Sequence, residues 1–163
     1  MDKKQIIELS NFSIHYFKKL VQNIPEDKIY EKQVEGINSA GWIMGHLCAE
    51  ATDLFTIFPP PIKMDYTWLM KFHNTAPKLQ ITKELPSKTE MLKVFDEFYD
   101  YLQKLYLNLT DEEMNKPCPG NILPKHFKSM SGSFHHHLTT HIFVHCGNLV
   151  VWKKLMNLPV EGY

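Results

Sequence analysis

A histidine-rich stretch over residues 134–149 constrains the fold of this chain more than any other segment. It reads Phe-His-His-His-Leu-Thr-Thr-His-Ile-Phe-Val-His-Cys-Gly-Asn-Leu and holds five of the nine histidines. Residues four apart on a helix lie one above the other, so His137, His141 and His145 would form a ladder on one side. Steps of four and three in the apolar pattern predict a seam on that side that faces a bundle core. The predicted seam consists of Phe134, Leu138, His141, His145, Asn148, Trp152 and Leu155.

Two imidazoles, His141 and His145, therefore stand at inward positions where Leu or Ile would be expected. Burying a polar ring costs free energy unless the ring finds a partner. One such partner is a divalent metal, because two histidines at i and i+4 on one helix face can bind one ion together. The alternative is two core histidines that bond to the backbone or to each other.

A third histidine on another inward face favours the metal. His46 lies in Gly-Trp-Ile-Met-Gly-His-Leu-Cys-Ala-Glu over residues 41–50 and borders an apolar stripe that one acid interrupts. The stripe consists of Ile43, Leu47, Glu50, Leu54 and Ile57. Three histidines with an open fourth position are the ligand set of a catalytic zinc-type site rather than a structural one.

Two further residues are candidates for catalysis. His137 lies one turn before His141 and could be a ligand, a base beside the ligands or a residue at the mouth of the site. Glu50 lies one turn beyond His46. It would hold an imidazole N–H or act as a general base on metal-bound water; the alternative is an acid at the bundle rim, paired with a lysine. Cys146 is expected to be a packing residue, and Asp53 is expected at the surface.

Four long amphipathic segments predict an all-α four-helix bundle in a single domain, residues 1–163. The helices are expected at about 4–23, 40–58, 88–109 and 130–156. Ser87 with Glu90 and Thr110 with Glu113 match capping boxes, the second opening a short helical turn. The connection between helices two and three, residues 59–86, is too long for a bare bundle loop. It is expected to cover one end of the bundle as a lid, and its length allows a parallel crossover.

The sequence resembles the DinB-like superfamily of metal-binding four-helix bundles. The resemblance rests on Gly-Trp-Ile-Met-Gly-His-Leu at 41–47, His-x-x-x-His-x-Gly-Asn at 141–148 and Trp-Lys-Lys-Leu-Met-Asn-Leu-Pro at 152–159. It covers nearly the whole chain and implies His46, His141 and His145 as metal ligands, an up-down-down-up arrangement and a homodimer. Asn148 stands where Gln is common in the family, and Ile142 stands where many members have Glu. A mechanism that needs an acid at position 142 is therefore not supported.

Composition excludes several classes of partner. The formal net charge is zero, and no run of like charge suggests binding to nucleic acid or to an anionic membrane surface. All eighteen basic residues are Lys, so no guanidinium clamp for a carboxylate or phosphate is present. Three scattered cysteines do not form a disulfide framework, and we expect a reduced, cytoplasmic setting without a secretory signal or membrane span.

These observations favour a metal-dependent enzyme that acts on a small molecule. A divalent ion, zinc or nickel, held by three imidazoles would activate water or a low-molecular-weight thiol. The resemblance includes both chemistries, as thiol S-transferases that use bacillithiol, mycothiol or glutathione and as metal-dependent hydrolases. The alternative is a non-catalytic, stress-associated or accessory bundle whose metal is only structural. A haem-binding bundle is a weaker third reading.

Overall fold

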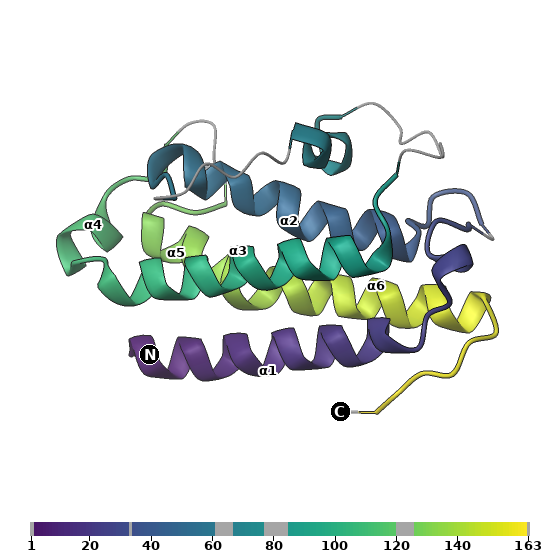
Figure 1. Cartoon of the computed structure of the whole chain (residues 1–163). Coiled ribbons are helices and arrows are strands. Elements are labelled where there is room, and N and C mark those ends of the chain that lie inside the picture. The colour runs from purple at the N-terminus through teal and green to yellow at the C-terminus, as the bar shows by residue number, and fades with distance from the viewer. Residues whose placement is uncertain (1, 33, 61–66, 77–84, 120–125, 163) are drawn as a thin grey trace.

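The computed structural model describes residues 2–32, 34–60, 67–76, 85–119 and 126–162. Within these ranges the regular structure is helical, apart from one isolated bridge between Pro117 and Ser129. Four long helical segments pack side by side (Figure 1), which confirms the predicted all-α bundle.

A side chain caps the start of each of the first three long helices. They are α1 (Lys3–Gln22), α2 (Ala40–Ile57) and α3 (Lys88–Asn108), and a short 3-10 turn, η1 (Glu26–Lys28), follows α1. The Ser39 hydroxyl accepts a hydrogen bond from the Trp42 N–H at the start of α2. Both predicted capping boxes form, at the starts of α3 and of the short α4 (Asp111–Asn115).

The fourth long helix is not continuous, although the apolar pattern predicted a single helix. It consists of α5 (Met130–His135), a π-helical segment (His136–Thr140) and α6 (His141–Leu155). In the π-helical segment the His141 N–H bonds to the carbonyl of His136, five residues back. The wider turn accommodates an additional residue, so the buried face of α6 advances by one position.

The predicted seam is therefore wrong at two positions of α6, whereas His141, His145 and Trp152 are buried as predicted. Asn148 is exposed and Leu155 is 37% exposed, whereas Leu149 and Met156 are buried in their place. The residues of α6 on the buried face are His141, Ile142, His145, Cys146, Leu149, Trp152 and Lys153.

The helices run up, down, down and up, as expected. Figure 1 shows α2 and α3 running in one direction, opposite to α1 and α6. Each of α1 and α2 packs against both α3 and α6, so the four helices form a square in cross-section. None of the helices that the structure describes has the length and apolar character to cross a membrane.

The long connection between α2 and α3 contains a 3-10 helix, η2 (Thr67–Phe72), whose Leu69 and Phe72 are buried. This part packs on the flank of α2 and not over one end of the bundle, which corrects the predicted position. Glycine at position 45 permits the contact, because a Cβ there would overlap the ring of Phe72. Residues 61–66 and 77–84 of the predicted lid lie outside the described residues.

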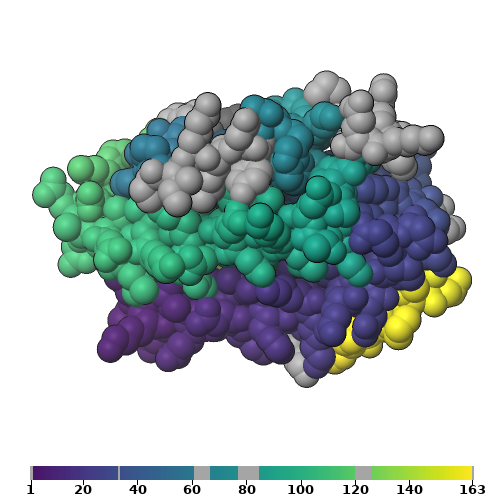
Figure 2. Space-filling view, in the orientation of Figure 1, coloured from purple at the N-terminus to yellow at the C-terminus, as the bar shows by residue number. Residues whose placement is uncertain are grey.

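A fully buried lysine attaches the C-terminal segment to α1. Lys153 Nζ donates to the Leu20 carbonyl at 2.9 Å and to Glu161 Oε2 at 2.5 Å. Glu161 also accepts a hydrogen bond from the Asn23 side chain at 3.0 Å. In the space-filling view the C-terminal segment, in yellow, lies beside the end of α1 (Figure 2).

Candidate metal centre

Three imidazoles from two helices converge between α2 and α6. The Nε2 atom of His141 lies 3.2 Å from Nε2 of His46 and 3.2 Å from Nε2 of His145. A tetrahedral ion with bonds of roughly 2.0 Å to imidazole nitrogen separates its ligand atoms by about 3.3 Å. The three side chains are all buried, and their nitrogen atoms have the spacing of ligands on one face of such an ion.

A backbone hydrogen bond sets the orientation of the His46 ring. Nδ1 of His46 lies 3.1 Å from the carbonyl oxygen of Phe72, which can only accept, so Nδ1 carries the proton. In a neutral imidazole the lone pair is then on Nε2, the atom that faces His141 and His145. A backbone carbonyl in this position is the usual partner of a metal-bound histidine.

The cluster does not satisfy its own hydrogen-bonding groups. The Nδ1 atoms of His141 and His145 are buried and have no hydrogen-bond partner among the described residues. A proton on His141 Nε2 can be donated well to only one of its two neighbouring nitrogens, which leaves the other contact unsatisfied. An ion that accepts all three Nε2 lone pairs resolves this conflict, so these residues fit a divalent metal.

Burial keeps these imidazoles neutral, the form that binds metals. It lowers the pKa of His46 to about 3 and that of His145 to about 4. Burial and then the neighbouring imidazoles hold the pKa of His141 far below its usual range. The three imidazoles can therefore donate their lone pairs at neutral pH.

A cavity of about 650 Å³ opens beside the three histidines. Its wall includes Trp42, whose ring stacks on His46 with centroids 4.4 Å apart, and His136, whose ring stacks on His141 at 5.0 Å. Phe127 adds an apolar surface. No lysine lies among the described residues of the lining, so the cavity suits a neutral or weakly polar small molecule.

The two candidate catalytic residues lie close to the cluster but outside it. His137 is buried, and its Nδ1–H donates to the Ser133 carbonyl at 2.9 Å. It lies within the π-helical segment, whose wider turn offsets it from His141, and it is not part of the three-histidine cluster. Glu50 Oε1 is 3.7 Å from His46 Nδ1, too far to be its hydrogen-bond acceptor. The Phe72 carbonyl fills that predicted role, and Glu50 instead accepts from the Asn74 N–H at 3.0 Å.

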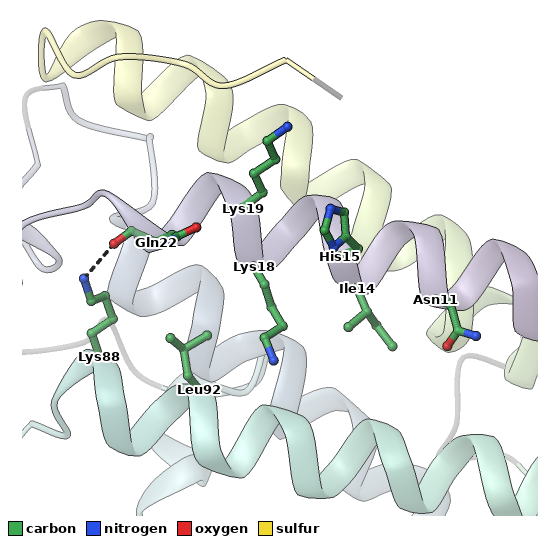
Figure 3. A pocket seen from close by; sticks show the side chains of 8 residues that line it. All are labelled: Asn11, Ile14, His15, Lys18, Lys19, Gln22, Lys88 and Leu92. Atoms are coloured by element: carbon green, nitrogen blue, oxygen red, sulfur yellow. Dashed lines mark hydrogen bonds between the residues drawn. The ribbon is translucent and has the colours of Figure 1, made fainter.

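A second cavity, of about 640 Å³, lies between α1 and α3 and shares no residue with the first (Figure 3). Two of the three lysines that line it have protein partners: Lys18 pairs with Asp96 at 2.7 Å, and Lys88 Nζ donates to the Gln22 carbonyl at 3.2 Å. His15 of α1 lines this cavity. The arrangement offers no cluster of ligands comparable with the three histidines.

Sequence reasoning placed the three histidines together but missed the residues that surround them. Trp42 and Phe72 contact His46, through the stacked rings and the backbone carbonyl respectively. His136 is half-buried against His141. No local signal in the sequence connects position 72 to position 46, because their contact depends on the path of the long connection. Cys146 is a packing residue as expected, and burial raises the pKa of its thiol to about 12.

A comparison with known protein families matches the part of the chain that contains the three histidines. The model that describes the DinB superfamily matches residues 11–149, which include all three histidines of the cluster. The comparison with curated proteins finds no match.

Proposed function

The chain belongs to the DinB superfamily, and we propose that it is a metal-dependent enzyme acting on a small molecule. His46, His141 and His145 would hold a divalent ion, zinc or nickel, since both accept three imidazole ligands. One observation carries the proposal: three buried Nε2 atoms converge beside a cavity of about 650 Å³. A solute in the cavity would therefore meet the three imidazoles that hold the ion.

A divalent ion in this position lowers the pKa of the water or thiol that it binds, which produces a nucleophile at neutral pH. We favour a low-molecular-weight thiol as co-substrate, in an S-transferase reaction, over water in a hydrolase reaction. The aromatic wall made by Trp42 and Phe127, without a lysine among the described lining residues, supports an uncharged electrophile as the second substrate.

The protein's own residues orient the ligands and exclude water. The Phe72 carbonyl fixes the tautomer of His46, and the Trp42 ring covers one face of the same imidazole. Glu50 and His137 line the cavity and are the candidate proton-transfer residues of this proposal.

Metal analysis of purified protein tests the ligand set. We expect about one equivalent of zinc or nickel in the wild type and a large loss in His46→Ala and His145→Ala. His15→Ala, a helical histidine outside the cluster, is the matched control and should keep the metal. Equal metal content in all four proteins would refute the ligand assignment.

An activity assay then separates catalysis from a structural ion. The metal-loaded protein would be incubated with an aryl halide and with bacillithiol, mycothiol or glutathione, and with an activated ester in the absence of thiol. The alternative, an accessory bundle whose ion only stabilises the core, is favoured by the deep burial of the three histidines. This alternative predicts a bound metal and no turnover, either of the aryl halide with any of the thiols or of the ester.

We also propose that two copies of the chain associate. Large apolar side chains are exposed on both α1 and α6, and Phe12 of α1 contacts Phe143 of α6 with ring centroids 5.8 Å apart. The exposed residues on these helices are Leu9, Phe12, Val144, Val151 and Leu155. Sedimentation of the wild type and of Val144→Glu tests the dimer, which the charged variant should dissociate.

A further inference from the structure

A second cluster of potential metal ligands lies next to the first. Glu50 and Asp53 extend from neighbouring positions on one face of α2, and His73 follows η2 directly. His73 Nε2 lies 3.5 Å from Glu50 Oε1 and 3.6 Å from Asp53 Oδ2. One ligand atom from each of these side chains lies within 4.8 Å of the other two.

The cluster places two carboxylates in a poorly hydrated position. The Glu50 side chain is 6% exposed and that of Asp53 is 23% exposed. Among the described residues no lysine forms an ion pair with either carboxylate. A cation held between them would offset the cost of their desolvation.

The imidazole supplies an independent observation. His73 Nε2 is buried, and among the described residues it forms no hydrogen bond and lies 3.5–3.6 Å from one oxygen of each carboxylate. Its other nitrogen, Nδ1, lies 2.8 Å from the Thr75 hydroxyl and 3.3 Å from the Thr75 N–H. The N–H contact favours a proton on Nε2 while no cation is bound. When a cation takes the Nε2 lone pair, the proton moves to Nδ1 and is donated to the hydroxyl, as in a histidine ligand held by an outer-shell partner.

Three consecutive residues, 72–74, attach the segment that carries His73 to α2. The Phe72 carbonyl accepts from His46, the His73 ring faces Glu50 and Asp53, and the Asn74 N–H donates to Glu50. The backbone at 72–74 thus fixes the position of the imidazole relative to both carboxylates. The geometry is that of a prearranged site rather than of flexible surface acids.

We propose that Glu50, Asp53 and His73 form a second site, which binds a divalent cation. Two carboxylates and one imidazole are a mixed oxygen and nitrogen set, which suits a harder first-row ion such as Mn²⁺ better than the three-imidazole cluster does. The site goes beyond the proposed function and does not require an ion at His46, His141 and His145. While a cation is bound there, Glu50 is a ligand, and His137 is then the proton-transfer candidate of the first site. The two sites are adjacent, because His46 Nδ1 of the first lies 3.7 Å from Glu50 Oε1 of the second.

Titration with Mn²⁺ tests the second site. The protein would first be loaded with zinc, so that the three histidines are occupied, and the free Mn²⁺ would be measured by electron paramagnetic resonance. We expect the wild type to remove about one equivalent of Mn²⁺. Asp53→Asn and His73→Gln, which nearly preserve side-chain size, should each weaken the binding at least tenfold. Asp100→Asn, on the exposed face of α3, is the matched control and should bind as the wild type does.

A variant of the three-histidine cluster distinguishes the two sites. Without added zinc, His145→Ala should still bind Mn²⁺, because its side chain takes no part in the second cluster. Binding that disappears in His145→Ala but persists in Asp53→Asn would assign the Mn²⁺ to the first cluster and overturn the proposal. Wild-type protein that leaves the Mn²⁺ signal unchanged would overturn it as well. His73 would then act only as an ion-pair partner of the two acids. Circular dichroism confirms that each variant is folded.

Discussion

His46 donates a hydrogen bond from Nδ1 to the carbonyl oxygen of Phe72 at 3.1 Å, although the two residues are 26 positions apart in the chain. The contact connects the long segment between α2 and α3 to the candidate metal centre. It leaves the lone pair of His46 on the atom that faces the other two histidines.

Gly45→Ala should disturb this contact. A Cβ at position 45 would overlap the Phe72 ring, so the ring must move away from α2. We expect a loss of about 1–3 kcal/mol in the free energy of unfolding, as for other overpacked sites, together with weaker metal binding. Urea unfolding and metal analysis measure the two effects.

Gly147→Ala is the matched control for that substitution. Gly147 lies within α6, and a Cβ there meets no atom within 4 Å. Replacing a helical glycine by alanine in open space should stabilise the protein by up to about 1 kcal/mol. Equal effects of the two substitutions would show that the contact between Gly45 and the Phe72 ring contributes neither to stability nor to metal binding.

The metal-free protein should lose stability as the pH falls from about 6.5 toward 4. Burial lowers the pKa of His137 and of His145 to about 4. In this window the unfolded chain binds protons at these positions and the folded chain does not. Each group then lowers the free energy of unfolding by roughly 1 kcal/mol per pH unit, and the loss ends once both states are protonated.

Urea unfolding across this pH range, with a chelator present, measures the loss. The contribution of His137 should be absent in His137→Gln, so the slope should be smaller in that variant. A stability that does not change with pH in the wild type would contradict the assignment of neutral, buried imidazoles.

Removal of the metal should lower the melting temperature of the wild type. An ion that binds only the folded chain stabilises it by mass action, by about 2.7 kcal/mol at a hundredfold excess over its Kd. A chelator should remove this contribution from the wild type and have little effect on His46→Ala. A chelator effect of equal size in both proteins would place the ion elsewhere.

Glu161→Gln should destabilise the fold, because it leaves the buried Lys153 ammonium without its carboxylate. Removing one member of a buried ion pair costs about 3–5 kcal/mol, and the partial exposure of Glu161 places this variant at or below the lower end. Asp100→Asn, which breaks the exposed pair with Lys104, is the comparison and should cost less than about 1 kcal/mol. Thermal unfolding of the two variants measures the difference.

The caps and helix periodicity made most of the bundle predictable. Ser39, Ser87 and Thr110 each begin a helix because their side chains bond to free N–H groups nearby in the sequence. The convergence of His46 with His141 was predictable because both border inward apolar stripes. These features depend on local spacing, which a sequence displays directly.

The π-helical segment and the second cluster were not predictable in this way. An i→i−5 turn has no simple apolar period, so the shift of Asn148 to the surface could not be read from the pattern. Asp53 was expected at the surface because its partner, His73, lies in the long connection. Asp53 and His73 meet because η2 packs on α2 at Gly45, where a side chain would block the contact. The sequence alone does not show this packing.

The π-helical segment also has a consequence for access. In a regular helix the two C-terminal histidines would occupy the middle of the buried face, among Ile142, Cys146 and Leu149. With the one-residue shift, the three apolar residues occupy the middle of the buried face and are at most 1% exposed. His141 and His145 lie at its edge, and each is 8% exposed. The imidazoles therefore border the cavity, where a solute arriving from outside can meet them.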